Sequence, residues 1–335
     1  MATIYEVSKL AGVSLATVSR VMNNNAKVSD KTRSKVLDAM TQLGYRPNSI
    51  AQSLASNVTN SVGVLVSELH GGFFGLVMNG IESELRLANK HIIITTGHSD
   101  EGQEKSAIDF LIGRKCDALI LLVDSVSDEE LIKISKAIPT VLINRKVDTL
   151  AERCISLDNE YGGYLATKHL LEQGHTDIAY VAGPDWKVDS HDRFVGHQKA
   201  LQEHNITFNE ALYYQGDFNE NSGYESFNKL KSRGINFSAI AFGNDEMASG
   251  AMKAARENGL ILPKDLSIIG FDNNMFASYL YPELTTIDNS AYQMGKMATD
   301  IILKDVYKQK NLNISKIINV FEPKLVCRNS VTPNA

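Results

Sequence analysis

The chain has 335 residues, of which 43% are hydrophobic, and a formal net charge of −5. This composition excludes a disordered chain and supports a large core, and the length favours two or three domains. No apolar run approaches the roughly 20 residues of a membrane-spanning helix, and no secretory signal is recognisable. Three scattered cysteines, Cys116, Cys154 and Cys327, argue against a disulfide framework or a zinc site, so we expect a cytoplasmic protein.

The first 60 residues differ in charge from the rest of the chain. They contain seven basic and three acidic side chains, a net charge of +4, which leaves −9 for the remainder. A small basic region on an acidic protein favours binding to a polyanion. A chance distribution of surface charges could give the same net charges, so the interpretation needs support from the local sequence pattern.

The first helix of this basic region begins with a capping box. The Thr3 hydroxyl can accept from the backbone N–H of Glu6, whose side chain can reach back. Gly12 ends the helix and allows a tight turn, after which Ser14 is a suitable N-cap for a second helix. Two short helices joined by such a turn are typical of a helix-turn-helix.

A third helix is predicted to brace the first two. It begins after Ser29, places Val36 and Met40 on one stripe, and ends at Gly44. Residues 1–46 are therefore expected to form one small all-α domain.

In a helix-turn-helix, the first residues of the second helix face base edges in the major groove. Here Arg20 can bond a guanine bidentately, and Leu15 or Ala16 can contact a thymine methyl. An ordinary three-helix domain with a solvated polar face is the alternative. The residues that we assign to DNA binding are Thr3, Ser14, Leu15, Ala16, Thr17, Ser19, Arg20, Asn23, Lys27, Thr32, Asn48, Ala51 and Leu54.

The N-terminal sequence resembles the DNA-binding head of the LacI/GalR family of bacterial repressors. The resemblance rests on the segments TIYEVSKLAGVSLATVSRVMNN and VSDKTRSKVLDAMTQLGYRPNSIAQSLA, and it covers residues 2–56 almost without interruption. It implies that the helix from Ser14 to Met22 is a recognition helix.

Residues 47–60 are expected to form a hinge helix and a polar linker. Pro47 suits the first position of a helix, but barely two turns follow, and so short a helix is marginal in isolation. The family resemblance implies that this helix pairs with its copy and wedges Leu54 into the minor groove, with Ala51 at the helix contact and Asn48 near the backbone. Without the resemblance, a plain linker helix is the better interpretation.

From Ser61 onward, short β-rich runs alternate with longer amphipathic stretches, which predicts parallel sheets covered by helices on both faces. The expected strands are Val62–Val66, Ile92–Thr95, Ala118–Val123, Thr140–Ile143, Ile178–Val181, Ala239–Phe242 and Ser267–Gly270. The expected helices include Met78–Asn89, Gln103–Ile112, Gly162–Gln173 and Glu246–Asn258.

The strands fall into two groups around residue 157. Residues 61–335 are therefore predicted to form an α/β body of two doubly wound subdomains, about 61–157 and about 158–287. The resemblance implies that the chain then returns to the first subdomain. It also implies a body like that of the two-lobed periplasmic sugar-binding proteins, which close on a ligand.

Ligands of open α/β sheets bind beyond the carboxyl ends of the strands, where aromatic, carboxylate, amide and guanidinium groups follow several expected strands. Such groups suit a sugar, because charged groups pair with neighbouring hydroxyls and aromatic faces cover the apolar side of the ring. Arg193, expected at the end of a loop, matches an effector-binding position of the family, as do Asn244 and Asp272. Helix capping and ion pairing are the alternative roles. The residues that we assign to the effector are Phe73, Phe74, Asn144, Asp158, Arg193, Phe218, Asn244 and Asp272.

The sequence lacks the motifs of common enzyme classes. It has no Gly-rich nucleotide loop, no G-x-S-x-G elbow and no H-E-x-x-H, and its eight histidines show no metal spacing. We therefore expect no catalytic residue, no metal and no cofactor. Paired carboxylates leave a sugar-processing enzyme as an alternative by residue type, but an enzyme would leave the helix-turn-helix unexplained.

Two body segments, VLINRKVDTLAERCISLDNEYGGYLATKHLLEQGHTDIAYVAG and NVFEPKLVCRNSV, resemble the galactose-responsive repressors of the family. The resemblance implies a homodimeric repressor of a sugar-utilisation operon. It would bind a near-palindromic double-stranded operator and be released by a small sugar, galactose. Another sugar, or a corepressor acting on the same fold, is the alternative. No leucine-heptad tail follows the body, which predicts a dimer and not a tetramer.

Overall fold

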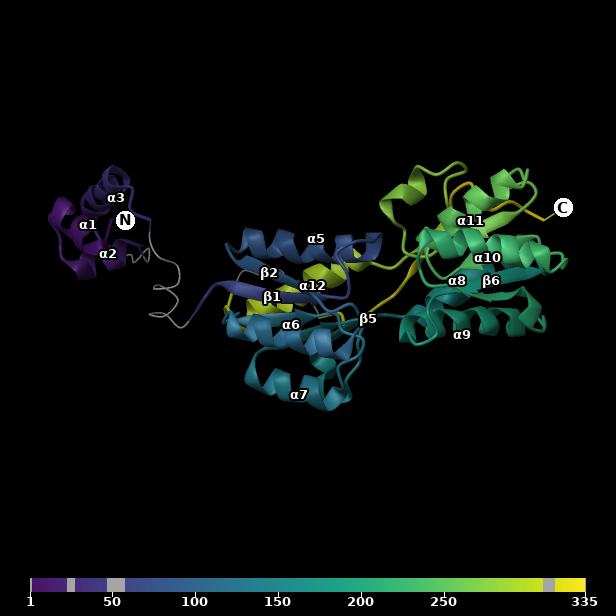
Figure 1. The fold of residues 1–335 in the computed structure, drawn as a ribbon, viewed down its shortest axis with the longest axis horizontal. Coiled ribbons are helices and arrows are strands. Elements are labelled where there is room, and N and C mark those ends of the chain that lie inside the picture. Colours follow the sequence, from purple (N-terminus) through teal and green to yellow (C-terminus); the bar gives the residue numbers. More distant parts are fainter. Residues whose placement is uncertain (1, 23–27, 47–57, 310–316, 335) are drawn as a thin grey trace. The chain divides into compact units, whose positions relative to one another are not determined.

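The computed structural model describes residues 2–22, 28–46, 58–309 and 317–334. The chain forms two compact units, Met1–Thr59 and Asn60–Ala335, which are drawn in Figure 1. None of the described helices combines the length and the apolar character that are needed to cross a membrane.

The N-terminal unit contains three helices, α1 (Ile4–Ala11), α2 (Leu15–Met22) and α3 (Asp30–Leu43). Thr3 and Glu6 form the predicted capping box, and Gly12 ends α1 in the left-handed conformation with φ of 64°. Ser29 and Gly44 cap α3 as predicted. The core consists of six buried side chains, Val7, Ala11, Val18, Val21, Val36 and Ala39. So small a core needs one face of each helix and leaves the other faces to solvent.

We call the first part of the body lobe 1. Its six-stranded sheet has the order β11-β5-β4-β3-β1-β2, and all neighbouring strands are parallel. The strands are β1 (Ser61–Val66), β2 (His91–Thr96), β3 (Ala118–Leu121), β4 (Thr140–Ile143), β5 (Cys154–Leu157) and β11 (Val320–Phe321). Helices α5 (Gly72–Leu87) and α12 (Ala291–Asp305) cover one face, and α6 (Glu101–Gly113) and α7 (Asp128–Ala137) cover the other. The 3₁₀ helix η1 (Asp148–Arg153) precedes β5.

Lobe 2 repeats this architecture with four parallel strands in the order β7-β6-β8-β9. The strands are β6 (Ile178–Ala182), β7 (Tyr213–Gln215), β8 (Ala239–Phe242) and β9 (Ser267–Ile269). Helices α8 (Asn159–Glu172) and α9 (Val188–Glu203) cover one face, and α10 (Glu220–Ser232) and α11 (Asp245–Glu257) cover the other. The 3₁₀ helices η2 (Glu210–Leu212) and η3 (Met275–Ser278) lie in its connections. The predicted all-α head and α/β body with parallel sheets are thus confirmed.

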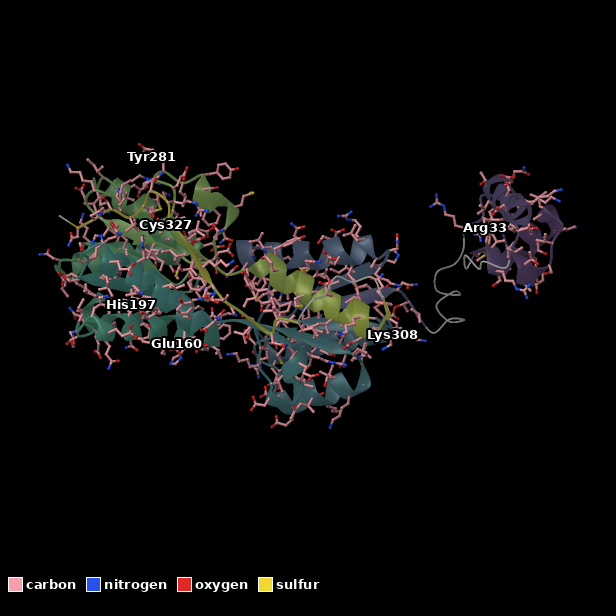
Figure 2. All side chains as sticks on the ribbon, turned by 180° about the vertical axis from the view of Figure 1, so that it is seen from behind. Arg33, Glu160, His197, Tyr281, Lys308 and Cys327 are labelled. Atoms are coloured by element: carbon pink, nitrogen blue, oxygen red, sulfur yellow. The ribbon has the colours of Figure 1, made fainter. Side chains whose placement is uncertain are left out.

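A buried histidine lies where α8 packs on α9. His197, labelled in Figure 2, is fully buried, and its Nδ1 lies 2.8 Å from the Thr167 hydroxyl. Burial lowers its pKa to about 3, so the imidazole is neutral near pH 7. Tyr180 and Phe194 complete the surrounding aromatic cluster.

The chain crosses between the lobes three times. After β5 it enters lobe 2, and after β10 (Thr286–Asp288) it returns to lobe 1 to form α12 and β11. It then runs back through β12 (Lys324–Val326), which pairs antiparallel with β10. The last described residues lie along lobe 2, where the Ile268 N–H donates to the Ser330 carbonyl. This final return was not predicted, because its short, mixed sequence carries no strand periodicity.

Two helices differ most from the sequence-based expectation. Helix α5 begins at Gly72 and not at Met78. The prediction missed its first turns because glycines flank Phe73 and Phe74, and glycine has a low helix propensity. Helix α9 was expected to be a loop as far as Arg193, but it begins at Val188.

Candidate functional site

The outer side of α2 carries side chains predicted to contact DNA. Val18 and Val21 are buried, whereas Ala16 and Arg20 are exposed on another side of the helix and Ser14 is exposed just before its first residue. Three further predicted residues are half-buried: Leu15, Thr17 and Ser19. The helix therefore presents an exposed arginine, a small residue and hydroxyls together, which is a suitable set for base edges and phosphates.

Thr3 and Thr32, which were also assigned to DNA, have structural roles at helix starts. The Thr3 hydroxyl accepts from the Glu6 N–H at 3.4 Å, and the Thr32 N–H donates to the Ser29 hydroxyl at 3.4 Å. Their contact with DNA stays a prediction. The other predicted contacts lie outside the described residues: Asn23, Lys27, Asn48, Ala51 and Leu54.

A cavity of about 590 Å³ lies at the carboxyl ends of strands from both lobes. This volume is within the roughly 300–1,000 Å³ of small-molecule sites. Seven of the eight residues assigned to the effector line it: Phe73, Phe74, Asn144, Arg193, Phe218, Asn244 and Asp272. The structure thus brings together side chains that are up to 199 positions apart in the sequence.

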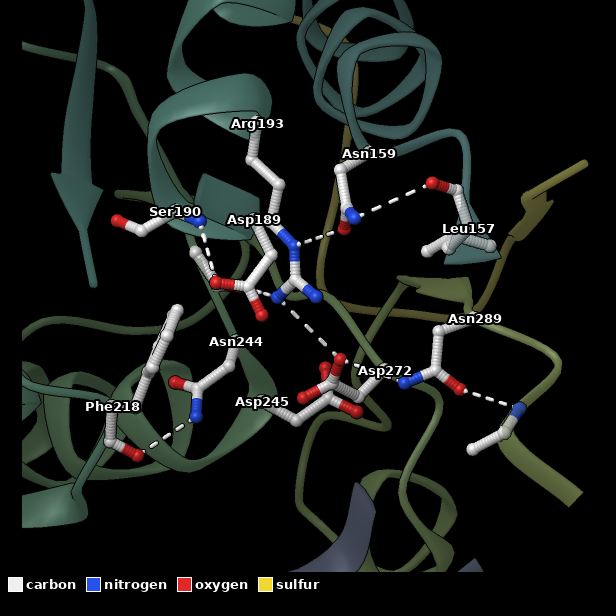
Figure 3. Close-up of polar contacts among 12 residues, drawn as sticks. Leu157, Asn159, Asp189, Ser190, Arg193, Phe218, Asn244, Asp245, Asp272 and Asn289 are labelled. Atoms are coloured by element: carbon white, nitrogen blue, oxygen red, sulfur yellow. Dashed lines mark hydrogen bonds and ion pairs between the residues drawn. The ribbon is translucent and has the colours of Figure 1, made fainter. Parts of the chain in front are cut away.

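A buried ion pair lies at the centre of the cavity wall. Arg193 Nη1 lies 3.6 Å from Asp272 Oδ1, and the two residues are only 5% and 6% exposed. Arg193 Nε donates to Asn159 Oδ1 at 2.9 Å, and Nη1 donates to the Gly243 carbonyl at 2.5 Å, as Figure 3 shows in part. The guanidinium is therefore held in one orientation before any ligand arrives.

One nitrogen of this arginine is left for a ligand. Among the described residues, Arg193 Nη2 has no hydrogen-bond partner, and the guanidinium stacks on Phe271 with its carbon 3.7 Å from the ring centroid. A planar donor fixed on an aromatic ring is suited to one or two hydroxyl oxygens.

Besides this ion pair, the Asp272 carboxyl group accepts a hydrogen bond from Asn289 Nδ2 at 2.9 Å. Burial raises its pKa well above the usual value, and nearby Glu246 and Asp245 act in the same direction against the opposing effect of Arg193. Burial also raises the pKa of Asp245 to about 7. Desolvated carboxyl groups are thus concentrated in the cavity wall, at Asp272 and Glu246, and beside it, at Asp245.

Asn244 combines a capping role with a place in the cavity wall. Its Oδ1 accepts from the Met247 N–H at 3.0 Å, and its Nδ2 donates to the Phe218 carbonyl at 2.8 Å. The same Nδ2 lies 3.0 Å from Glu246 Oε2. The capping alternative is therefore correct for Asn244, and it is compatible with ligand contact because the residue lines the cavity.

Polar contacts join the two lobes around the cavity. Lys187 Nζ of lobe 2 lies 2.8 Å from Asp124 Oδ2 of lobe 1, and Asn144 Nδ2 donates to Asp189 Oδ2 at 3.2 Å. Burial by itself would raise the pKa of Asp124, but the charge and hydrogen bond of Lys187, together with hydrogen bonds from Ser99 and Ser67, outweigh it and lower the pKa below the usual value. The two lobes are thus connected through charged and amide side chains at the cavity.

Backbone strain is concentrated at the same place. Asn144, Phe218 and Asp272 line the cavity and have φ of 61°, 72° and 116°, in the region that favours glycine. Such conformations cost of order 1–3 kcal/mol each and persist where the surroundings impose them. Their clustering supports a functional role for this cavity.

Two predicted placements need correction. Asp158 does not line the cavity: its carboxylate accepts from the Tyr161 N–H at 3.0 Å and caps α8, beside a separate depression with Lys199. It follows a strand of lobe 1 but begins a helix of lobe 2, so its side chain turns to that helix. Arg193 lies within α9 and not at a loop end, and the helix aims it into the cavity.

Several lining residues were not predicted. They include Asp124, Lys187, Asp189, Glu246 and Asn274. Asp124 follows β3 closely, so the strand-end rule could have found it. The others lie in or beside helices of lobe 2 and carry no local signal. Among the described residues, no group of three or more His, Cys, Asp or Glu side chains is arranged to hold a metal ion.

Two family models match the sequence. The model described as bacterial regulatory proteins, lacI family, matches residues 3–48. The model of a periplasmic binding protein-like domain matches residues 167–331. The two matches fall on the head and on the two-lobed body respectively.

Curated relatives and solved structures match nearly the whole chain. The HTH-type transcriptional regulator GalR of Escherichia coli (strain K12) is 39% identical over 333 residues, which is 99% of this chain and 96% of that protein. The HTH-type transcriptional repressor PurR of Actinobacillus pleuropneumoniae is 35% identical over 334 residues, 99% of this chain and 98% of that protein. The lac repressor dimer bound to operator and the anti-inducer ONPF shares 30% identity at a TM-score of 0.86, covering 99% of each chain.

Proposed function

The chain belongs to the LacI family of bacterial regulatory proteins, and from this premise we propose a galactose-responsive repressor. Its head binds an operator in double-stranded DNA as part of a homodimer, and galactose in the cavity of the body lowers that affinity. The single observation that carries the proposal is the combination of an exposed α2 with a built polar cavity in one chain.

The head supports the DNA part of the proposal. Exposed Arg20 and Ala16 on α2 suit the major groove, and the positive charge of the first 60 residues suits phosphates. A dimer doubles these contacts on a near-palindromic site. Binding should weaken steeply with salt, because phosphate contacts release counterions.

The charge of the cavity supports a neutral sugar. Its described lining carries seven acidic side chains, Glu68, Asp124, Asp189, Asp217, Glu220, Glu246 and Asp272, against two permanent cations, Lys187 and Arg193. Both cations are already paired with carboxylates, so the site disfavours phosphorylated or acidic ligands. Vicinal hydroxyls suit the Arg193–Asp272 pair, and Phe73, Phe74 and Phe218 offer apolar faces. The 39% identity with GalR favours galactose among neutral sugars.

The test is an operator titration in the presence of candidate ligands. Duplex fragments from the source genome are first selected by binding, and D-galactose, D-glucose, galactose 1-phosphate and hypoxanthine are then added. We expect galactose to weaken operator binding and the anionic ester to have no effect. If hypoxanthine alone changes operator binding, the effector is a purine and not a sugar. If the protein binds no fragment at low salt, the proposal is overturned.

Two variants separate the DNA and sugar functions. Arg20→Ala should weaken operator binding and keep galactose affinity, whereas Asp272→Asn should bind operator and lose the response to galactose. A normal response of Asp272→Asn would refute the assignment of the cavity. Sedimentation checks the dimer, and a stable tetramer would contradict it.

We further propose that the cavity binds without catalysis and that the protein acts in the cytoplasm, where the chromosome is. The carboxyl groups of Asp245 and Asp272 are held by side-chain hydrogen bonds from Thr286 and Asn289. Incubation with nitrophenyl glycosides should release no nitrophenol. Turnover that disappears in Asp272→Asn would instead show an enzyme.

A further inference from the structure

We propose that Lys90 is the positioning residue through which the state of the cavity reaches the linker, and that helices α5 and α12 act as one lever between them. The inference rests on the proposed sugar response and adds a route for it. It starts from contacts at both ends of this helix pair.

Both helices begin at the cavity. The N–H of Gly72, the first residue of α5, donates to Glu246 Oε1 of lobe 2 at 3.2 Å. At the start of α12, Asn289 donates to Asp272 through Nδ2 at 2.9 Å, and its Oδ1 accepts from the Ala291 N–H at 3.0 Å. A ligand that moves Asp272 or Glu246 therefore acts directly on the first turns of the two helices.

The two helices are packed as one body. A Cβ at Gly80 of α5 would overlap the Tyr292 carbonyl, and a Cβ at Gly295 of α12 would overlap the Val77 carbonyl, so the backbones touch. Lys296 Nζ also lies 2.7 Å from Glu84 Oε1 across the pair. Helix α12 spans about 22 Å at 1.5 Å per residue. Figure 1 shows the pair lying along one face of lobe 1.

The far ends of the helices meet at the residue where the chain enters the body. Lys90, just after α5, donates from Nζ to Asn60 Oδ1 at 2.6 Å, and the same Nζ lies 4.0 Å from the ring centroid of Tyr307, just after α12. The Tyr307 hydroxyl donates to Asp117 Oδ2 at 2.8 Å. Asn60 is the first residue of the body unit and the last residue of the predicted linker. Lys90 therefore connects both helix ends to the end of the linker.

The chemistry of Lys90 suits a geometrical role. Burial lowers the pKa of its ammonium group against the opposing charge of Asp117, and burial followed by the hydrogen bond to Asp117 raises the pKa of Tyr307. An ammonium group with one hydrogen bond and one aromatic contact fixes the distance between Asn60 and the helix ends. Removal of the ammonium group should weaken the coupling between the cavity and the linker without changing the residues of the cavity.

The test compares Lys90→Met, which keeps the length of the side chain, with Tyr307→Phe, which keeps the ring and loses the hydroxyl. Lys304→Met, an exposed lysine at the end of α12, is the matched control. Galactose affinity is measured by the fluorescence of Trp186, the only tryptophan, which lines the cavity. Operator affinity is measured with and without saturating galactose.

We expect the galactose dissociation constant of Lys90→Met to stay within about twofold, while the galactose-induced loss of operator affinity shrinks by roughly threefold or more. Tyr307→Phe should show a smaller change in the same direction, and Lys304→Met should match the wild type. The inference is overturned if the ratio of operator affinities without and with galactose is unchanged in both Lys90→Met and Tyr307→Phe. A tenfold loss of galactose affinity in Lys90→Met also overturns it, because the residue would then act on the cavity itself.

A measurement without DNA distinguishes this inference from the proposed function. The His91 N–H donates to the Asn60 carbonyl at 2.7 Å, and the Asp117 N–H donates to the Ser61 carbonyl at 2.8 Å. Galactose should change the hydrogen exchange of these two amides in the wild type and not in Lys90→Met. If galactose changes this exchange in a wild-type protein that binds no operator, the result supports the proposed coupling through α5 and α12 and refutes the proposed repressor function. No change at either amide in the wild type overturns the lever.

Discussion

The head and the cavity hold their proposed functional side chains in opposite ways. On α2, Arg20 and Ala16 are exposed and lie outside the core of the head, which is on the other side of the helix. In the cavity, Arg193, Asn244 and Asp272 are at most 6% exposed and are tied into the packing of lobe 2. A residue of the head can therefore change function without changing stability, whereas a residue of the cavity changes both.

The largest effect that tests this comparison is on the buried ion pair. Arg193→Ala should lower the free energy of unfolding of lobe 2 by about 3–5 kcal/mol, because it leaves buried polar partners unpaired. Urea denaturation followed by Trp186 fluorescence measures this loss. Arg193→Met combined with Asp272→Asn is the control and should recover much of it. A loss below 1 kcal/mol in Arg193→Ala would break the comparison.

The corresponding change on the head should affect binding alone. Arg20→Ala should weaken operator affinity by about 1–3 kcal/mol and relax the preference for one base pair. Its free energy of unfolding should stay within about 0.5 kcal/mol of the wild type, as for other exposed side chains. Anisotropy titrations with substituted operators and urea denaturation check the two parts. Destabilisation comparable to that of Arg193→Ala would refute the distinction.

Low pH should destabilise the body through a buried neutral histidine, which gives a further test of the comparison. The pKa of His197 is about 3 in the folded protein, below the value of about 6.5 in an unfolded chain. The unfolded state therefore binds more protons below pH 6.5, and the stability from this group falls as pH drops from 6.5 towards 3. Between pH 7 and pH 5, the wild type should lose about 2 kcal/mol more than His197→Phe. The free energy of unfolding of both proteins is measured across this pH range. The same pH dependence in the two proteins would contradict the prediction.

The smallest effect concerns the helix starts of the head. Thr3→Ala should lower the stability of the head by about 1 kcal/mol, because it removes a capping box. Ser29→Ala, which removes the cap of α3, is the matched variant. Native-state hydrogen exchange of the α1 and α3 amides measures both. A loss of operator affinity in Thr3→Ala beyond that in Ser29→Ala would show that Thr3 also contacts DNA.

The local sequence determined the head almost completely. The capping box at Thr3, the turn at Gly12 and the stop at Gly44 each depend on residues within a few positions, so their effects can be read without the fold. The apolar runs of β3, β4 and β8 likewise predicted buried strands, because parallel strands covered on both faces are apolar throughout. The strand-end rule then led to eight assigned effector residues, of which seven line the cavity.

Only the tertiary structure decided how the cavity is closed and connected. Lys187 and Asp124 pair across 63 positions, Gly72 and Glu246 across 174, and no local pattern predicts which distant partners meet. Asp158 turns to the helix that it begins, although it follows a strand as the cavity residues do. The pKa of Asp272 also depends on its burial and on the charge of Arg193, which lies 79 positions earlier in the sequence. Short-range rules fix helix ends and strands, whereas burial and long-range pairing belong to the folded chain as a whole.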